Sequence, residues 1–385
     1  MSKFKLTIFI GRKSPFHNGH AEVLQRARLK SDAVLVLLGS INQARNPKNP
    51  WSFKERSDVI TKWSVRTGIQ TDKKLCPVNV LGIRDYPYND QLWIANVHRV
   101  VDSYIKELKL LQSDVEICIT GADRDSSTFY LKYFPNWKSD IVDENLEVSR
   151  FLTATAVREI YFGRSFNGNE ITADHAELLM KAFLPSETID ALREFEKTDF
   201  YDNLRAEHLG NVAYRKAVEP RKPETFGPKD PGVKYETIFQ TVDAIVVQTG
   251  HILLVKRKAH PGKGLWALPG GFVNPKERLV DAMIRELNEE TRIKVPDAVL
   301  RSSIVFKDDL DFPERSLRGR TISKCFLIKL PDFVVDGKIT LPKVKGQDDA
   351  EKAWWVPINE IMQNPEMFFE DHWFAIESFL GKLSS

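Results

Sequence analysis

Apolar residues in the first part of the chain gather in short runs, and longer amphipathic stretches separate these runs. The runs are nearly all apolar, like strands that are buried on both faces of a sheet: residues 4–10, 33–38, 78–83 and 115–120. The stretches between them have the pattern of helices: residues 19–30, 52–65 and 91–111. Strands that alternate with helices predict an α/β fold with a doubly wound parallel sheet, which binds ligands beyond the carboxyl ends of its strands.

The pattern changes after a proline-rich segment. Residues 168–216 are polar and helix-forming, and residues 220–232 then carry four prolines among charged residues, which indicates a linker. Beyond it, one strong helix is expected at 279–290 among strand-like runs: residues 237–247, 252–256, 303–306, 323–330 and 353–356. The aromatic run near the end is expected to pack a last helix. We therefore predict a Rossmann-like domain (1–190), a helical connection with the linker (191–232) and an α+β domain (233–385).

Composition narrows the class of protein. The chain has 385 residues, of which 42% are hydrophobic and 28% charged, as in globular proteins. Lys and Arg (56) exceed Asp and Glu (53) by only 3, which argues against a chain-wide nucleic-acid surface. The cysteines (Cys76, Cys118, Cys325) are too few and too far apart for a disulfide framework. Without a signal peptide or membrane segment, we expect a cytoplasmic protein whose partners are small molecules; a homo-oligomer is left open.

The first predicted strand leads into a motif with two histidines. The motif reads Gly11-Arg12-Lys13-Ser14-Pro15-Phe16-His17-Asn18-Gly19-His20. It ends at the start of a predicted helix, where unpaired N–H groups and the helix dipole attract phosphate. Gly19 lets the backbone approach a ligand closely, and two imidazoles can donate hydrogen bonds to phosphate oxygens. A histidine here could instead cap the helix or bind a metal, but the whole motif favours nucleotide chemistry.

A second segment that could bind phosphate, residues 153–158, lies far downstream in the sequence. Thr153 or Thr155 can cap a helix there, and Arg158 in its first turn can face an anion. Alone, this segment is merely a well-capped helix. Together with His17 and His20 in a parallel sheet, it predicts a second side of one phosphate site.

Together these motifs resemble the HxGH nucleotidyltransferases, in the archaeal-type nicotinamide mononucleotide (NMN) adenylyltransferase branch. The resemblance implies direct in-line transfer of AMP from ATP to the phosphate of NMN, which gives NAD and pyrophosphate. It implies catalytic roles for His17, His20 and Arg158. The residues that it implies for ATP, with Mg²⁺ (or Mn²⁺), are Gly11, Arg12, Pro15, Phe16, Gly19, Thr153 and Thr155.

The same resemblance implies where the second nucleotide binds. The family's segment for the nicotinamide ring is matched by residues 89–93, with Asn89 and with Trp93, which could stack on the cationic ring. Trp93 could equally be a core residue of an amphipathic helix. Residues 121–127 resemble the family's nucleotide-contacting loop, where Gly121 and Asp123 are the candidates.

The most specific pattern of the chain is an acidic helix behind a glycine pair. It reads Gly271-x5-Glu277-x7-Arg285-Glu286-Leu287-x-Glu289-Glu290. Glu286, Glu289 and Glu290 are neighbours on a helix, so their charges repel unless cations hold them. Carboxylate ligands suit Mg²⁺ or Mn²⁺, which can activate water and clamp a pyrophosphate. Arg285 and Glu277 are expected to pair and to fix the loop against the helix. A solvated acidic face is the plain alternative.

This pattern resembles the Nudix box, which implies catalytic roles for Glu277, Arg285, Glu286, Glu289 and Glu290, the last three as metal ligands. One residue departs from the family pattern, because Arg292 stands where a glycine normally ends the helix in a left-handed turn. The acidic loop at 346–351 resembles that of ADP-ribose pyrophosphatases, in which a late carboxylate assists the water, and Glu351 is the candidate. The residues expected to bind ADP-ribose are Gly270, Gly271, Arg318 and Arg320.

In this order the two halves resemble the bifunctional NMN adenylyltransferase/Nudix hydrolase proteins. The resemblance implies that the second domain hydrolyses ADP-ribose to AMP and ribose 5-phosphate, and we expect two independent sites. One rival is another HxGH transferase, using CTP or phosphopantetheine, fused to a Nudix hydrolase of a different diphosphate. Another is a Nudix-like sensor of NAD metabolites, although such a sensor would need a DNA-binding module and could lose the acidic residues.

Overall fold

The computed structural model describes residues 3–69, 75–122, 130–142, 153–218 and 237–383. The chain divides into two compact units, Met1–His208 and Leu209–Ser385. The boundary between them falls within helix α7 (Asp199–Val218). The domain limits 1–190 and 233–385 stay a prediction. Among the described residues, no helix combines the length and apolar character that crossing a bilayer requires.

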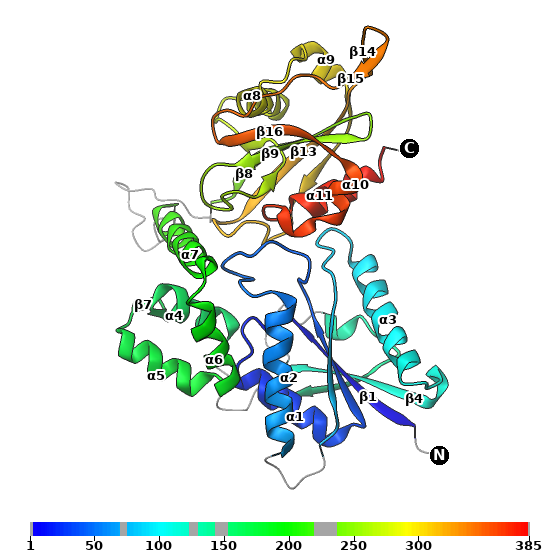
Figure 1. Cartoon of the computed structure of the whole chain (residues 1–385), viewed down its shortest axis with the longest axis vertical. Helices are drawn as coiled ribbons and strands as arrows, with labels where there is room; N and C mark the ends of the chain where they lie inside the picture. Colours follow the sequence, from blue (N-terminus) through cyan, green and yellow to red (C-terminus); the bar gives the residue numbers. More distant parts are fainter. Residues whose placement is uncertain (1–2, 70–74, 123–129, 143–152, 219–236, 384–385) are drawn as a thin grey trace, which may run out of the picture. The chain divides into compact units, whose positions relative to one another are not determined.

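A five-stranded sheet in the order β3-β2-β1-β4-β5 forms the centre of the first unit (Figure 1). All its neighbouring strands are parallel: β1 (Phe4–Gly11), β2 (Ala33–Leu38), β3 (Val78–Gly82), β4 (Val115–Ala122) and β5 (Lys138–Val142). This confirms the predicted doubly wound α/β fold. Because the chain proceeds from β1 to β2 and β3 on one side and returns to β4 and β5 on the other, the strand order reverses beside β1. A ligand site is expected at the carboxyl end of that strand.

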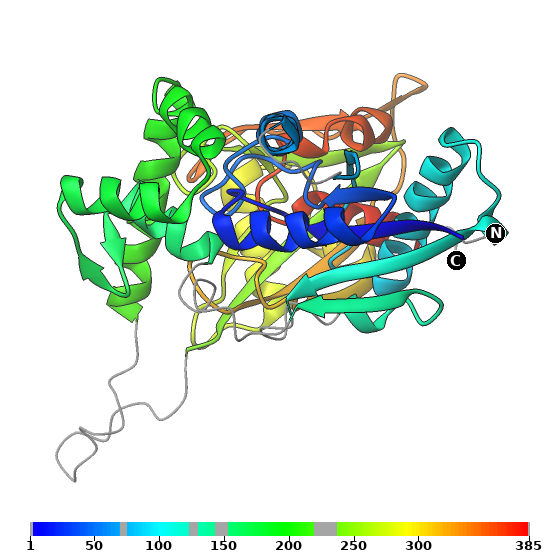
Figure 2. The same cartoon turned by 90° about the horizontal axis from the view of Figure 1, so that it is seen from below.

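Helices cover both faces of this sheet, because its central strands are apolar on both sides. On one face, Val34 and Val36 of β2 pack in one core with residues of α1 (Asn18–Lys30) and α2 (Phe53–Ile69). On the other face, Leu35 and Leu37 share a core with α3 (Asp90–Glu107). Figure 2 shows α1 running along β1.

The first unit continues into helices that pack against one another rather than on the sheet. The main elements are α4 (Ala154–Gly163), the hairpin β6 (Ser165–Phe166) and β7 (Asn169–Glu170), α5 (Ala173–Phe183), α6 (Ser186–Phe195) and the first part of α7. Their shared core contains Trp51, Tyr161, Phe162 and Phe195. This confirms the helical character predicted for residues 168–216.

The second unit is built on a seven-stranded mixed sheet. Its strands are β8 (Phe239–Gln248), β9 (His251–Arg257), β10 (Trp266–Ala267), β11 (Gly270–Phe272), β12 (Ile304–Leu310), β13 (Thr321–Lys329) and β16 (Ala350–Pro357). The order is β10-β9-β8-β13-β12, with β11 also paired to β8 and β16 to β9. The short hairpin β14 (Phe333–Val335) and β15 (Lys338–Thr340) stands apart from the sheet. Each of the five runs expected as strands in this part of the chain overlaps one of these strands, namely β8, β9, β12, β13 or β16.

The helices of this unit are α8 (Leu279–Thr291), α9 (Asp297–Ser302), α10 (Ile358–Gln363) and α11 (His372–Leu380). The apolar side of α8, with Met283 and Leu287, packs in one core with Val242 and Phe326 of the central strands. In α11, Phe379 contacts the ring of Phe306 on β12. The last helix therefore packs onto the second unit, as the aromatic C-terminal run predicts.

Candidate active sites

The two histidines of the first motif form the start of α1. His17 is the N-cap, and its Nδ1 accepts a hydrogen bond from the His20 backbone N–H at 3.4 Å. In return, Nδ1 of His20 accepts one from the His17 N–H at 3.3 Å, and the two rings stack with centroids 3.6 Å apart. A neutral imidazole whose Nδ1 accepts carries its proton on Nε2. Each ring therefore has its Nε2–H as the donor at a helix N-terminus, where an anion is favoured.

The downstream element lies beside this motif. Thr153 caps α4 by accepting from the Ala156 N–H at 3.0 Å. Arg158 is 8% exposed and donates to the Ser14 carbonyl at 2.6 Å and to Thr155 Oγ1 at 3.1 Å. A charged hydrogen bond across 144 positions of sequence thus joins the start of α4 to the loop that precedes His17. The structure brings together the two phosphate-type elements that the sequence singles out.

The loop between β1 and α1 is held from several sides. Phe16 is buried and packs against His20 and Trp63, and Gly19 is buried in the first turn of α1. Pro15 follows Ser14, the residue that Arg158 contacts. The loop is fixed by packing as well as by hydrogen bonds, so the histidines are presented on a rigid support.

No role was predicted from the sequence for two cations of this region, Arg56 and Lys13. The buried Arg56 of α2 donates to the Arg12 carbonyl at 2.7 Å and to the Gly39 carbonyl at 2.9 Å, and burial lowers its pKa to about 10. It therefore ties the loop after β1 to the end of β2. Lys13 is also buried, with its ammonium 3.3 Å from the centroid of the Phe9 ring, and a Cβ on Gly11 would lie 2.8 Å from its Nζ. In the sequence, Lys13 could have been suspected because it directly follows Arg12 in the motif.

The residues expected to bind the second nucleotide lie on β4 and α3. Gly121 lies at the carboxyl end of β4. Asn89 caps α3 by accepting from the Leu92 N–H at 3.1 Å. Trp93 is half-buried and contacts the ring of Tyr130, whose hydroxyl donates to the Ile10 carbonyl at the end of β1. Trp93 thus belongs to the core and also adjoins the phosphate motif. Asp123 lies outside the described residues.

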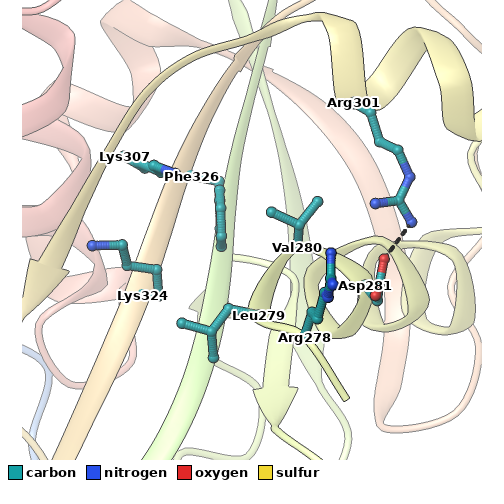
Figure 3. Close-up of a pocket in the computed structure, with 8 residues that line it drawn as sticks. All are labelled: Arg278, Leu279, Val280, Asp281, Arg301, Lys307, Lys324 and Phe326. Atoms are coloured by element: carbon teal, nitrogen blue, oxygen red, sulfur yellow. Dashed lines mark ion pairs between the residues drawn. The ribbon is translucent and has the colours of Figure 1, made fainter.

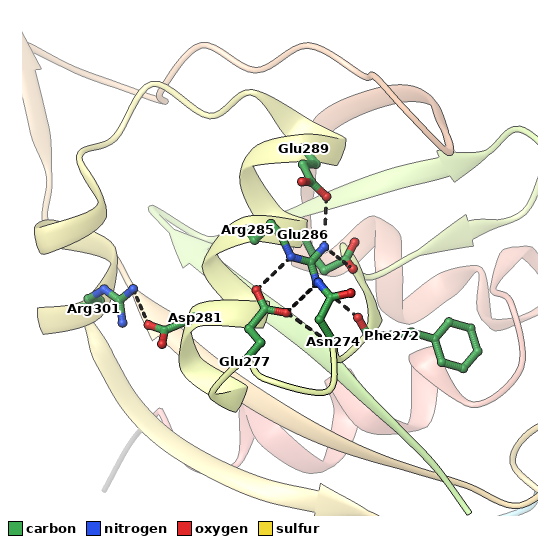
Figure 4. Close-up of polar contacts among 8 residues, drawn as sticks. All are labelled: Phe272, Asn274, Glu277, Asp281, Arg285, Glu286, Glu289 and Arg301. Carbon is green, nitrogen blue, oxygen red and sulfur yellow. Dashed lines mark hydrogen bonds and ion pairs between the residues drawn. The ribbon is translucent and has the colours of Figure 1, made fainter.

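In the second unit, Arg285 of α8 joins the acidic residues of the helix to the loop that precedes it (Figure 4). Its guanidinium donates twice to the Glu277 carboxylate at 2.9 Å and once to the Phe272 carbonyl at 3.1 Å. It also donates to Glu286 at 2.7 Å and to Glu289 at 3.0 Å. The hydrogen bond from Arg285 lowers the pKa of Glu277 to about 2. The expected pairing of Arg285 with Glu277 is therefore present.

Glu290 has a different environment from the other two helix carboxylates. It is 7% exposed, and its carboxylate accepts from the Gly270 N–H at 3.0 Å. Burial raises its pKa to about 8. Gly271 allows α8 to approach β11, because a Cβ there would lie 2.6 Å from the Glu286 carboxylate. The two glycines thus allow β11 to lie close to the acidic face of the helix.

The chemistry of these residues fits a divalent cation. The candidate donors are carboxylate oxygens, which Mg²⁺ and Mn²⁺ prefer. Glu290 is an acid whose ionised form is penalised by burial, and a cation would relieve that penalty. As the described side chains stand, no three of His, Cys, Asp or Glu are grouped as a metal would require. Arg285 pairs with both Glu286 and Glu289. Arg285 contacts Oε1 of Glu286 and Oε2 of Glu289, so a metal there would share these two carboxylates with Arg285.

The other predicted substrate residues surround the same helix in part. Arg318 lies over the ring of Phe272, 5.5 Å from its centroid, next to the strand that carries Gly271. Arg320 donates to the Asp311 carbonyl at 2.6 Å. Glu351 is half-exposed and pairs with Lys256 at 3.1 Å. The structure thus associates Arg318 with the acidic site and gives Arg320 and Glu351 partners of their own.

Two residues whose charges act on Glu290, Arg257 and Asp349, were not predicted from the sequence as site residues. Arg257, at the end of β9, stacks on Phe369 at 4.0 Å from its ring centroid, and burial lowers the pKa of Arg257. Its charge acts on Glu290, as does that of Asp349 in the acidic loop. The Gln347 N–H of that loop donates to the Glu290 carbonyl at 3.1 Å. Arg257 ends a predicted strand, but an isolated arginine in that place carries no motif.

A buried cluster of charged residues lies next to this region. Arg315, 6% exposed, donates to Asp371 at 2.9 and 3.0 Å and lies 3.5 Å from Asp243. Ser323 donates to Asp243 at 2.5 Å. Asp243 on β8 pairs in register with Gly270, so the cluster adjoins the strand that contacts Glu290. A buried pair of this kind needs all its partners, because an orphaned charge is costly.

Comparisons with known proteins match both units separately. Residues 8–160 match the cytidylyltransferase-like family, and residues 238–377 match the NUDIX domain family. A nicotinamide/nicotinic acid mononucleotide adenylyltransferase of Acinetobacter baylyi is 30% identical over 208 residues, which are 54% of this chain and 95% of that protein. An ADP-ribose pyrophosphatase of Methanocaldococcus jannaschii is 34% identical over 139 residues, 36% of this chain and 71% of that protein.

Solved structures match the chain as a whole. A bifunctional NMN adenylyltransferase/ADP ribose pyrophosphatase from Francisella tularensis is 31% identical, with a TM-score of 0.80 over 98% of this chain and 99% of that one. A structure described as the same kind of protein in complex with AMP and a manganese ion is 30% identical, with a TM-score of 0.77 over the same shares of the two chains. Both predicted halves and their order are confirmed. The chain therefore belongs to the family of bifunctional NMN adenylyltransferase/ADP-ribose pyrophosphatase proteins.

Proposed function

We propose that this chain is a bifunctional enzyme of NAD metabolism. The first unit transfers AMP from ATP to NMN, and the second hydrolyses ADP-ribose to AMP and ribose 5-phosphate. The observation that carries the proposal is that one chain contains both assembled sites: His17 and His20 joined to α4 by Arg158, and Glu290 held against Gly270.

In the first unit, the phosphate of NMN attacks the α-phosphorus of ATP in line with the departing pyrophosphate. A P–O bond to NMN forms while the bond to pyrophosphate breaks, and no enzyme group is modified. The Nε2–H donors of His17 and His20, with Arg158, stabilise the charge on the phosphate oxygens. Because NMN already carries an anionic nucleophile, the enzyme mainly positions the reactants and needs no base of unusual pKa.

In the second unit, water attacks one phosphorus of the ADP-ribose diphosphate. Its oxygen bonds to phosphorus, the P–O–P bridge breaks, and its proton passes to a carboxylate of the loop at 346–351, where Glu351 is the sequence candidate. Arg257 and Arg318 are cations that suit the diphosphate, and both lie near Glu290 or Phe272. Glu286, Glu289 and Glu290 would hold a divalent cation, which would supply Lewis-acid stabilisation and lower the pKa of water. Mg²⁺ or Mn²⁺ would suit this site, and the same kind of ion would accompany ATP at the first site.

Separate assays of two variants test this function. His17→Ala should lower NAD formation from ATP and NMN by about two to three powers of ten, the usual effect of losing one donor to a charged transition state. It should leave the release of AMP from ADP-ribose intact. Glu290→Gln should give the opposite pattern.

One further substrate makes the assay specific. Phosphopantetheine replaces NMN in one arm, and turnover of it in preference to NMN would contradict the first half of the proposal. Loss of neither activity in the two variants would contradict the assigned sites. Failure of the wild type to release AMP from ADP-ribose with Mg²⁺ or Mn²⁺ would contradict the second half.

A further inference from the structure

A cavity of about 370 Å³ lies beside the first turn of α8, on the second unit (Figure 3). Its apolar lining comes from Leu279, Val280 and Phe326, and Phe326 is only 1% exposed. Its charged lining comes from Arg278, Asp281, Arg301, Lys307 and Lys324. The cavity therefore joins an apolar floor to a cationic rim, contributed by α8, α9, β12 and β13.

This cavity is separate from the acidic site of the same helix. Glu286, Glu289, Glu290 and Arg285 are not among the residues that line it. Figure 4 shows the pair of Asp281 and Arg301 to one side of α8, apart from the fork of Arg285. A ligand in the cavity would thus contact the start of α8 without meeting the carboxylates proposed to bind metal.

The rim carries more positive charge than the protein itself neutralises. Arg301 pairs with Asp281 at 2.8 Å, and Lys324 pairs with Asp309 at 3.1 Å. Within the part of the chain that the structure describes, Arg278 and Lys307 have no acidic partner. Two positive charges remain, which match the charge of a phosphate monoester near neutral pH.

The start of α8 adds to this positive field. Arg278 is the N-cap, and its side chain makes no capping hydrogen bond. A cation at a helix N-terminus is unfavourable, because the first N–H groups already carry partial positive charge. The helix start, Arg278 and Lys307 would all be stabilised by one dianion.

The volume of the cavity and its apolar lining further limit the class of ligand that it can bind. A volume of about 370 Å³ is at the small end of ligand pockets, so it suits a mononucleotide better than a dinucleotide. The side chains of Leu279 and Val280 are half-buried and can receive a flat ring, while the rim receives a phosphate. We propose that this cavity is an accessory binding site for a nucleoside 5′-monophosphate, distinct from both catalytic sites.

The test uses the full chain with ¹³C-labelled Leu and Val methyl groups and AMP as the probe. EDTA is present to suppress metal-dependent binding at the acidic site. AMP should shift the methyl signals of Leu279 and Val280 saturably, and Glu290→Gln should leave this response unchanged. Adenosine and inorganic phosphate are titrated separately. Both should bind more weakly than AMP, because adenosine lacks the phosphate for the cationic rim and inorganic phosphate lacks the ring for the apolar lining.

Charge variants make the result specific to the cavity. Arg278→Ala/Lys307→Ala should weaken AMP binding at these methyls by at least about tenfold. Arg278→Lys/Lys307→Arg should retain it, and so should Lys294→Ala/Lys338→Ala, which removes two exposed cations outside the cavity. Absence of a saturable shift, equal affinity for adenosine or for phosphate alone, or full binding by the double-alanine variant would overturn the proposal. None of these results depends on catalysis.

Discussion

At the scale of single residues, Arg285 is shared between a structural partner and two proposed metal ligands. Its guanidinium contacts Glu277, Glu286 and Glu289, so removing one carboxylate redistributes the others. In Glu277→Gln, the amide no longer neutralises Arg285, which then holds Glu286 and Glu289 more strongly against a metal. We expect ADP-ribose hydrolysis to fall by about 10- to 100-fold, the usual effect of altering a residue that orients a metal ligand.

Asp281→Asn is the matched control for this prediction, since it removes another carboxylate of α8 that pairs with an arginine, Arg301. Hydrolysis should be nearly unchanged in that variant, and extra Mg²⁺ should partly rescue Glu277→Gln only. Equal losses in the two variants would show that Glu277 acts merely through helix stability.

His372 makes the stability of the second unit depend on pH. It is buried, its Nδ1 accepts from the Leu268 N–H at 2.8 Å, and burial lowers its pKa below the ordinary 6.5. The folded chain therefore keeps the ring neutral, whereas the unfolded chain takes up a proton as the pH falls below about 6.5. Its contribution to stability is present above this pH and is lost below it, with a slope of at most about 1.4 kcal/mol per pH unit.

His372→Asn tests this slope, because an amide oxygen can accept from Leu268 but does not titrate. Calorimetry from pH 5 to 8 should show a shallower loss of the free energy of unfolding in the acid range for this variant. Identical slopes in the wild type and His372→Asn would contradict the assignment.

At the scale of elements, the end of α8 shows how the chain tolerates its departure from the family pattern. Arg292 adopts the left-handed conformation that a glycine would supply, with φ 44° and ψ 38°. Arg164 ends α4 in the same way, with φ 48°. The helix keeps its usual ending, and the arginine carries the steric cost of its Cβ.

Arg292→Gly should therefore raise the free energy of unfolding of the second unit by about 1 kcal/mol. Arg292→Ala keeps the Cβ and should give no such gain, which separates backbone strain from the loss of the charged side chain. Urea denaturation measures both variants, and ADP-ribose hydrolysis should be retained in Arg292→Gly. A similar gain in the alanine variant would show that the side chain, not the backbone, is responsible.

The sequence predicts elements well where burial dictates the pattern. Strand β2 is apolar on both faces, β1 and β4 are mostly apolar, and the helix α8 has a clear apolar side, so each has a strong signal. The edge strand β5 has the polar sequence Lys-Ser-Asp-Ile-Val, and hairpin β14–β15 is mostly exposed, so neither has such a signal. Their pairing depends on the neighbouring strand, which local sequence does not encode.

The same distinction applies to site residues. Motifs with fixed spacing, such as His17 with His20, can be recognised in the sequence because the two side chains lie one helix turn apart. The hydrogen bond between Arg158 and Ser14 spans 144 positions, and it forms because the fold places the start of α4 next to the loop after β1. Arg257 and Arg56 act through tertiary contacts of single arginines, for which a sequence holds no periodic or motif signal.

At the scale of the whole molecule, each unit contains its own core and its own proposed site. The sheet cores of the first unit include Leu35 and Val36, whereas that of the second includes Val242 and Phe326. His17, His20 and Arg158 belong to one unit, and Glu286, Glu289 and Glu290 to the other. Coupling between two sites requires that a ligand of one site favours a different state of the other.

We therefore expect the two activities to be independent. Glu290→Gln holds ADP-ribose without consuming it, provided that calorimetry first shows saturation of this variant. The KM for NMN in NAD formation should then change by less than about twofold when ADP-ribose is saturating, since allosteric coupling usually changes affinity by at least about fivefold. Because coupling free energy is reciprocal, saturating NMN should leave the affinity for ADP-ribose equally unchanged. A fivefold shift in both directions would show that the two units form one regulated enzyme, whereas a shift in KM alone would indicate competition by ADP-ribose at the first site.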